Sequence, residues 1–269
     1  MNRLSSFLGS LGRKTHGVAV ETSRISDLVR ASFYWAVFAP FSGKRNLRKH
    51  LILHQLHFMG NESFVITAMV TASVGAVLAL QAAYQLKEFG ALIYTGALVN
   101  VSIARELGPV VTAIVMAGRV GASVTAELGT MKVQEEVDAL TTIGIPPIPY
   151  LVVPRVLAML IALPCLTILG DAIGMLGGFL IGSYGLGIPA GIYWQEGFEA
   201  MVPKDITSGI VKSVVFALLI GINATYQGLT VEGGSESVGK ATTTSVVFSI
   251  IAIILADCVL TAIFFYVLT

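Results

Sequence analysis

Charged side chains inside otherwise apolar segments are the residues of this sequence most able to do chemistry. Arg105 and Glu106 stand at the edge of one apolar segment, and Lys212, Asp257 and Asp171 lie within three others. A charge at the centre of a membrane helix costs about 2.5–3.5 kcal/mol, so we expect these groups to pair with one another or to line a polar cavity. The pairs are either structural, holding helices together, or part of a path for a polar solute. The structural interpretation is favoured for two charges in the middle of one segment, Arg119 and Glu127.

Three histidines weakly indicate a metal site. His50, His54 and His57 stand at i, i+4 and i+7, a spacing that places three imidazoles on one helical face, as zinc binding would need. Because no cysteine or aspartate stands nearby, a solvated or interfacial face is favoured over a metal site. The nucleophile–base motifs H-E-x-x-H and G-x-S-x-G are missing from the sequence. We therefore expect this chain to hold no metal and to catalyse no reaction itself.

The segment 234–241 approximates the phosphate-binding loop of nucleotide-hydrolysing proteins. It reads G-S-E-S-V-G-K-A and so contains G-x-x-x-x-G-K, but Ala241 replaces the Ser or Thr whose hydroxyl binds magnesium. The segment also leads directly into an apolar span. We expect no nucleotide and no other cofactor to bind this chain.

The composition indicates a protein that crosses a membrane several times. Of its 269 residues 55% are hydrophobic and 12% are charged, which is too few charges to cover a soluble surface, and the mean hydropathy is +0.80. Disordered, collagen-like and nucleic-acid-binding classes are excluded on the same grounds. Nine of the 17 Lys and Arg residues fall within the first 49 positions, against two acidic residues, so the N-terminus is expected in the cytoplasm. Cys165 and Cys258 lie in apolar segments and are expected to be small buried residues without a disulfide.

The apolar segments predict an all-α integral membrane protein with about five transmembrane helices. We expect the spans at about 63–86, 106–128, 150–185, 207–229 and 241–267, because each is long enough to cross a hydrocarbon core of about 30 Å. Residues 89–104 are apolar but too short for a comfortable crossing, so they predict a half-inserted or interfacial element. The third segment is longer than one crossing needs and has prolines near its start, which predicts one long helix that is kinked or tilted.

The remaining segments predict an N-terminal arm and a short cytoplasmic helix. Residues 1–60 are expected to form the arm and 61–269 the membrane domain. Within the arm, residues 15–38 read as a basic amphipathic helix, which either lies in the membrane interface or packs on the rest of the protein. Residues 132–142 are too polar to span and predict a short amphipathic helix.

A stripe of small residues marks the third predicted span. Glycine recurs there every four residues, at Gly170, Gly174, Gly178 and Gly182. The spacing places all four on one side of a helix, which lets a neighbouring helix approach closely. We interpret the stripe as a helix-packing surface.

Several motifs together resemble the MlaE family of ABC-transporter permeases. The resemblance rests on the segment 104–140, which begins A-R-E-L-G-P-V-V and contains A-G-R-V-G-A-S-V-T-A-E-L-G, and on G-I-P-P-I-P-Y-L-V-V-P-R-V-L-A at 144–158. Residues 80–91, the segments around Lys212 and Asp257, and the Gly-rich loop before residue 241 extend it from about residue 60 to the end.

The resemblance implies a homodimeric permease that handles phospholipid or a related lipid in the bacterial inner membrane, with the plastid inner envelope less favoured. Two cytoplasmic ATPase subunits, which would hold the ATP and Mg²⁺, and a periplasmic ring of MCE-domain proteins are the implied partners. In the family the polar helix after the second span is a coupling helix that meets the ATPase. Here it corresponds to Glu135, Glu136, Asp138, Ala139 and Leu140. Glu136 replaces the usual Gln, so a compensating basic residue is expected on the ATPase.

The lipid cavity is expected where an apolar wall meets charges able to reach a headgroup. The wall is one face of the first span, formed by Val77, Leu80, Gln81 and Tyr84. The charges lie in or near the spans, at Arg105, Glu106, Lys212 and Asp257. Two other functions remain open on the sequence. An ion-coupled secondary transporter would use the same intramembrane charges, and a membrane enzyme acting on lipid is the weakest alternative.

Overall fold

The computed structural model describes residue 30 and residues 49–268 of the chain. Within these residues every regular element is a helix and no strand occurs, which confirms the predicted fold class. The predicted amphipathic helix at 15–38 and most of the N-terminal arm lie outside the described residues.

Five helical runs are long and apolar enough to cross a membrane, as predicted: His50–Glu88, Leu92–Val133, Ile148–Gly185, Pro203–Leu229 and Ser235–Tyr266. The first contains α2 (Lys49–Leu56), η2 (His57–Asn61) and α3 (Glu62–Glu88). The second contains η3 (Leu92–Tyr94), α4 (Thr95–Ser102), η4 (Ile103–Leu107), α5 (Gly108–Met116), η5 (Ala117–Gly121) and α6 (Ala122–Val133). The third contains η6 (Ile148–Val152), α8 (Val153–Leu180) and η7 (Ile181–Gly185), and the last two are α10 (Pro203–Leu229) and α11 (Ser235–Leu268).

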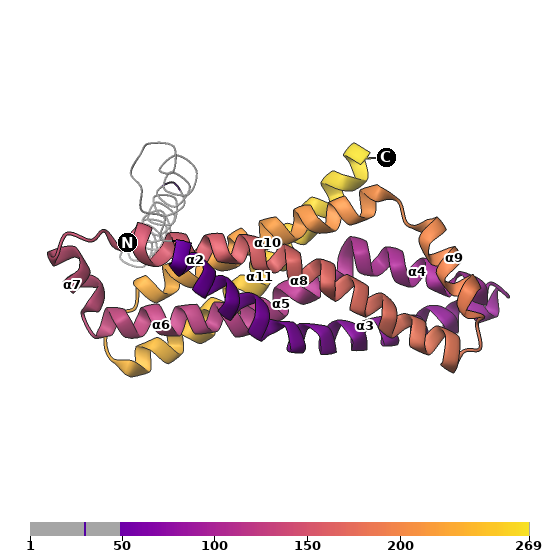
Figure 1. Cartoon of the computed structure of the whole chain (residues 1–269), viewed down its shortest axis with the longest axis horizontal. Helices are drawn as coiled ribbons and strands as arrows, with labels where there is room; N and C mark the ends of the chain where they lie inside the picture. Colours follow the sequence, from indigo (N-terminus) through magenta and orange to yellow (C-terminus); the bar gives the residue numbers. More distant parts are fainter. Residues whose placement is uncertain (1–29, 31–48, 269) are drawn as a thin grey trace, which may run out of the picture.

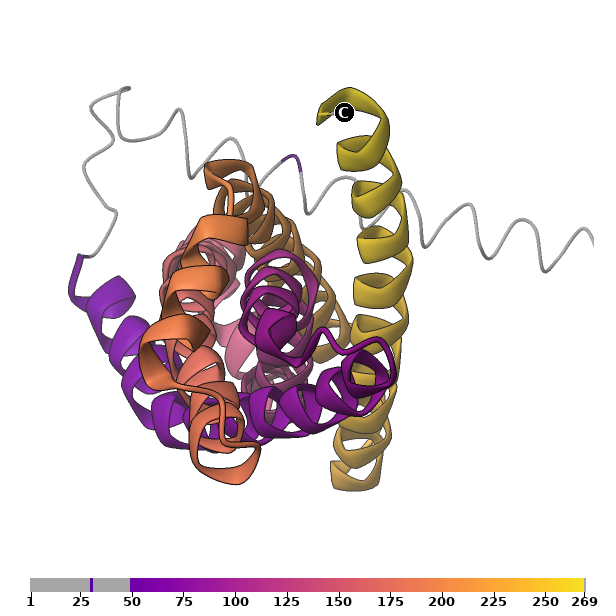
Figure 2. The same cartoon turned by 90° about the vertical axis from the view of Figure 1, so that its right-hand side faces the viewer.

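The long helices form an elongated bundle with short helices at its two ends. α3 packs along α8, and α10 packs against α8, α6 and α11. At one end lies α7 (Glu136–Thr142), and at the other α4 packs on α9 (Ala190–Ala200), as Figure 1 shows. α11 is inclined to the other long helices, which is clearest along the bundle axis (Figure 2). The two ends of the bundle are therefore built differently, with an exposed polar helix at one and a helix pair at the other.

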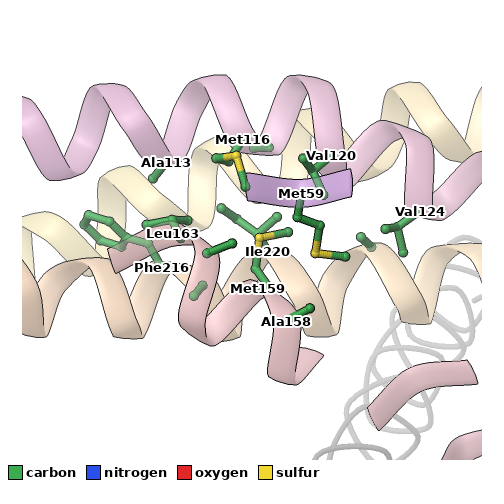
Figure 3. Packing of buried hydrophobic residues seen from close by; sticks show 14 of the residues in the cluster. Met59, Ala113, Met116, Val120, Val124, Ala158, Met159, Leu163, Phe216 and Ile220 are labelled. Atoms are coloured by element: carbon green, nitrogen blue, oxygen red, sulfur yellow. The ribbon is translucent and has the colours of Figure 1, made fainter. Parts of the chain in front are cut away.

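The hydrophobic core joins all five runs in the half of the bundle nearer α7, and Ile253 of α11 belongs to it. Side chains from η2, the second run, α8 and α10 meet there, as Figure 3 shows for Met59, Met116, Val120, Met159, Leu163, Phe216 and Ile220. The flexible methionines fill the irregular space between helices that cross at different angles. This core holds the second run, which carries Arg105, Glu106, Arg119 and Glu127, against its neighbours.

Small and hydroxylated residues replace large apolar ones where α3 meets α8. Every fourth residue of α3 faces inward, namely Ser63, Thr67, Thr71, Gly75 and Ala79. Lipid gives apolar helices no hydrophobic reason to associate, so close packing of small residues takes that role. The backbones of α3 and α8 approach so closely that a Cβ at Gly75 would lie 1.9 Å from the carbonyl oxygen of Gly174.

Three expectations differ from the structure. Residues 89–104 form no separate element, because α4 continues into the second run through η4. The segment 132–142 is two elements, since α6 extends to Val133 and α7 begins only at Glu136. The expectation that both cysteines are buried is wrong: Cys165 and Cys258 are exposed on the outside of the bundle. A membrane helix is apolar on its lipid side as well, so apolar neighbours in sequence do not indicate burial.

Candidate functional site

A buried lysine joins three helical elements at the centre of the candidate site. Lys212 of α10 is fully buried, and its Nζ forms ion pairs with Glu106 of η4 and, at 2.8 Å, with Asp257 Oδ1 of α11. Nζ also donates to Thr261 Oγ1 at 2.7 Å, and the Thr261 hydroxyl donates to the Glu106 carboxylate at 3.2 Å. We call Glu106, Lys212, Asp257 and Thr261 the Lys212 cluster. Its two carboxylates, which are partly exposed, and its buried ammonium leave a formal charge of −1.

A second ion pair lies beside this cluster. Arg105 Nε is 3.3 Å from Asp205 Oδ1, and the aspartate is buried whereas 48% of the arginine side chain is exposed. Asp205 also accepts a hydrogen bond from the Val202 backbone N–H at 3.0 Å, which caps the start of α10. Asp205 was not among the site residues predicted from the sequence. Its position just after Pro203 at a helix start is a recognisable capping signal.

The π-helical turn η4 explains how two adjacent residues reach one helix. Asp205 and Lys212 are seven residues apart, so they lie on the same face of α10 about two turns from each other. Arg105 contacts the first and Glu106 the second. π-helical turns are rare and often occur at functional sites. Here the turn directs both charges from the second run onto α10.

Arg119 and Glu127, the two charges in the middle of the second run, also form ion pairs with neighbouring helices. Arg119 contacts Ser63 and, at 3.0 Å, Glu62 Oε2 at the start of α3. Arg155 of α8 is 2.6 Å from Glu127 Oε1 of α6. Arg119 and Glu127 therefore do not pair with each other. Each ties the second run to a different neighbouring helix.

The first-span face lies at the surface of the single chain. The exposed fraction is 61% for Val77, 51% for Leu80 and 76% for Tyr84, and Gln81 is exposed as well. The opposite side of α3 is the small-residue face that packs on α8. Among the described residues no hydrogen bond or ion pair joins the first-span face to the Lys212 cluster. The fold of one chain therefore brings the charges together but not the apolar wall.

Only some of the residues predicted to contact the ATPase are exposed and without a partner in the described part of the chain. Glu135, Glu136 and Ala139 are exposed, whereas Leu140 packs partly against the core next to buried Val137. Glu135 has φ 60°, a left-handed conformation that ends α6 and turns the chain into α7.

One predicted coupling residue has a partner within the chain. Both carboxylate oxygens of Asp138 lie 3.0 Å from Lys132 Nζ at the end of α6. This ion pair connects α7 to the second run. Asp138 is therefore placed to hold α7 in position.

The glycine stripe lies against three different helices. A Cβ at Gly170 would lie 3.1 Å from Thr71 Cγ2, and one at Gly174 would lie 3.2 Å from the Thr71 carbonyl oxygen of α3. At Gly178 and Gly182 the near atoms are Val99 Cγ1 at 2.6 Å and Tyr193 Cε2 at 2.5 Å, from α4 and α9. The stripe therefore packs along its whole length.

Neither weak motif gains support from the structure. Lys240 of the phosphate-loop-like segment is 76% exposed and lies 2.7 Å from Glu236 one turn earlier, on the first turns of α11. His50, His54 and His57 are exposed, and the described part of the chain contains no group of three or more residues able to hold a metal ion.

Comparison with known proteins agrees with the motifs. The family model described as Permease MlaE matches residues 52–263. The chain belongs to the MlaE permease family. A probable ABC transporter permease protein of Rickettsia bellii is 40% identical over 264 residues, which cover 98% of this chain and 100% of the relative.

Two further relatives carry names that refer to lipid. The intermembrane phospholipid transport system permease protein MlaE of Haemophilus influenzae is 37% identical over 241 residues, 88% of this chain and 92% of the relative. The chloroplastic protein TRIGALACTOSYLDIACYLGLYCEROL 1 of Arabidopsis thaliana is 38% identical over 213 residues, 79% of this chain and 61% of the relative. The MlaE family match includes the whole Lys212 cluster, Arg105, α7 and the glycine stripe.

Proposed function

We propose that this chain is the membrane permease subunit of an ATP-driven phospholipid transporter in a bacterial inner membrane. Membership of the MlaE permease family carries the proposal, and the five membrane-length helices agree with it. The chain works as a homodimer, with its N-terminus in the cytoplasm. Cytoplasmic ATPase subunits hold the ATP and Mg²⁺, and a periplasmic MCE-domain protein receives or delivers the lipid.

The lipid site combines an apolar wall with a partly exposed cation. A phospholipid has an anionic phosphate and two acyl chains, so its site needs an apolar surface and a cationic or hydrogen-bonding group near one end. Val77, Leu80, Gln81 and Tyr84 supply the wall. Arg105 is the cation best placed for the phosphate, because about half of its side chain is exposed although it is paired with Asp205.

The Lys212 cluster supports the site from within. Lys212 is buried and already has two carboxylate partners, so its ammonium is not open to a headgroup. We assign Lys212, Glu106 and Asp257 the role of fixing η4 against α10 and α11. This arrangement keeps Arg105 beside Asp205 at the start of α10.

The coupling helix receives the ATPase through its exposed residues. Glu135, Glu136 and Ala139 form the contact, together with Ile143, which is 69% exposed just after α7. Asp138 and Leu140 act indirectly, since the first pairs with Lys132 and the second packs on the core. Force applied to α7 therefore reaches the second run through the Lys132–Asp138 pair.

Photo-crosslinking in the assembled complex tests the lipid site. A photoreactive amino acid at Val77, Leu80 or Tyr84 should capture radiolabelled phospholipid in an ATPase-active complex. The same probe at Ile143, on the coupling segment, is the control and should capture none. Absence of lipid at all three first-span positions would disprove the assigned wall, although the permease assignment would stand.

Transfer assays separate the proposed function from its alternatives. Proteoliposomes that contain the complex should move phospholipid to an acceptor only when ATP is present. Transfer that follows an ion gradient without the ATPase would instead show a secondary transporter. Chemical conversion of the lipid by the purified chain would show an enzyme.

A further inference from the structure

A carboxyl group that belongs to neither ion-pair system lies beside η4. Asp171 follows Gly170 on α8, and a Cβ at Gly108 would lie only 1.5 Å from Asp171 Oδ1. The Ile103 carbonyl oxygen lies 2.9 Å from the same point. The carboxyl oxygen therefore rests against the Cα of Gly108, next to the carbonyl at the start of η4. Any residue larger than glycine at position 108 would occupy the place of the carboxyl.

Asp171 has no cation near it within the described part of the chain. Its Oδ1 is buried without a hydrogen-bond partner, and none of the seven ion pairs includes it. Arg155, on the same helix, is 16 residues away, or about 24 Å along the axis. Of the acidic residues Glu106, Asp171, Asp205 and Asp257 in this region, Asp171 alone lacks a counter-ion among the described residues.

The neighbouring helices offer no free cation either. α4 and α5 contain no charged residue, and α3 has none between Glu62 and Lys87. The cations of η4 and α10 already have partners. Arg105 pairs with Asp205, Lys212 pairs with Glu106 and Asp257, and Lys204 also takes part in an interaction. An ionised Asp171 would thus be an unpaired charge inside a membrane helix bundle, which is strongly unfavourable.

The groups around the carboxyl are hydrogen-bond acceptors or hydroxyls. The Ile103 carbonyl accepts the Gly108 N–H that closes η4, and its second lone pair remains available for another donor. Thr112, one turn after Gly108, is fully buried and its Oγ1 has no partner among the described residues. A carboxylate would repel the carbonyl oxygen, whereas a protonated carboxyl can donate to it.

We infer that Asp171 is a protonated carboxylic acid whose O–H donates to the Ile103 carbonyl oxygen and so fixes the π-helical turn η4. Asp171 is then a positioning residue for Arg105 and Glu106, the two charges that η4 directs onto α10. The protonated state follows from the environment of the carboxyl alone. Its effect on lipid transfer rests on the proposed function.

Infrared spectroscopy of the purified complex at neutral pH tests the protonation directly. The wild type should show the carbonyl stretch of a protonated carboxylic acid, and Asp171→Asn should lose that band. Asp138→Asn is the matched control and should keep it, because Asp138 is exposed and paired with Lys132. Loss of no band in Asp171→Asn would overturn the inference whatever the complex transports.

Transfer measurements test the positioning role. An asparagine amide is neutral and can donate to the same carbonyl, so Asp171→Asn should keep wild-type transfer and thermal stability. Asp171→Leu has no donor, and its ATP-driven transfer should fall by about threefold to tenfold, as expected when one neutral hydrogen bond is lost. Wild-type transfer in Asp171→Leu would contradict the role, and so would an Asp171→Asn protein that is inactive or does not fold. If the infrared band behaves as expected but no lipid moves in any complex, the proposed function fails and the protonated Asp171 stands.

Discussion

Adding one methyl group at Gly75 should separate α3 from α8. The Cβ of an alanine there would lie 1.9 Å from the Gly174 carbonyl oxygen and 2.7 Å from its carbon. A comfortable carbon–oxygen contact is about 3.3 Å, so the two backbones would have to move apart by about 1.4 Å. The opposing atom belongs to a helix backbone and cannot rotate away as a side chain can. Gly75→Ala therefore strains the whole interface.

The cost should lie at the upper end of the usual range for overpacking, which is about 1–3 kcal/mol. Separation of the helices also loosens the contact between Ala72 and Gly177 on the same interface. A Cβ at Gly177 would lie 2.2 Å from the Ala72 carbonyl oxygen, a similarly short distance. A gap of about 0.5–1 Å already removes a quarter to a half of the dispersion energy of the contacts it opens. At about 2–4 °C per kcal/mol, a loss of about 3 kcal/mol lowers the Tm by about 6–12 °C.

Thermal unfolding of the detergent-solubilised protein measures this loss, with two variants as references. Gly118→Ala should have a Tm equal to or above that of the wild type, because no atom lies within 4 Å of its Cβ and alanine favours a helix by about 1 kcal/mol. Gly174→Ala should fall between the two, since its nearest contact is 3.2 Å. A wild-type Tm for Gly75→Ala would refute the close approach of α3 and α8.

Other substitutions test the remaining assignments. Glu135→Lys with Glu136→Lys should abolish lipid-stimulated ATP hydrolysis without lowering the Tm, since exposed charges contribute little to stability; unchanged stimulation would exclude them from the ATPase contact. Lys212→Met should destabilise the protein by up to about 3 kcal/mol, the lower end of the range for a buried ion pair, because two partly exposed carboxylates lose their cation. Neutralising both partners as well should recover most of the loss in a denaturation assay. Tyr193→Phe should leave stability at neutral pH unchanged or higher, because the buried hydroxyl has no partner among the described residues. Burial raises the pKa of Tyr193 from 10.0 to about 12, so the unfolded chain loses this proton first, and wild-type stability should fall above about pH 10 in a way that the Phe variant does not share.

Hydropathy predicted the five spans because a chain in lipid has few options. Every backbone N–H and C=O must be satisfied within the span, so a long apolar segment is read as a helix. The helical run that contains the second predicted span begins at Leu92, before the predicted start at about 106. Arg105 and Glu106 interrupt the apolar pattern there. η4 lets the helix continue through them, because it directs both charges onto α10.

The partners of the charges could not be predicted from spacing. Glu62 and Arg119 are 57 positions apart, and Glu127 and Arg155 are 28 apart, so each pair depends on which helices become neighbours. The glycine stripe shows the opposite case. Its four-residue spacing is a local property of one helix and predicted a packing face, and in the structure all four glycines lie against neighbouring elements; the close backbone approach at Gly75, on the partner helix, was not predicted.

The second run connects the two ends of the proposed mechanism. It begins at Leu92, carries Arg105 and Glu106 in η4, and ends at Val133 beside the Lys132–Asp138 pair that holds α7. From Glu106 to Val133 is 27 residues, or about 40 Å of helix. A push that reaches the end of α6 passes along this axis to η4 without crossing a loop, because α5, η5 and α6 continue one another. The ion pair of Arg119 with Glu62 fastens η5 to the first run, so the run that holds the proposed apolar wall and the run that carries Arg105 are joined at that point.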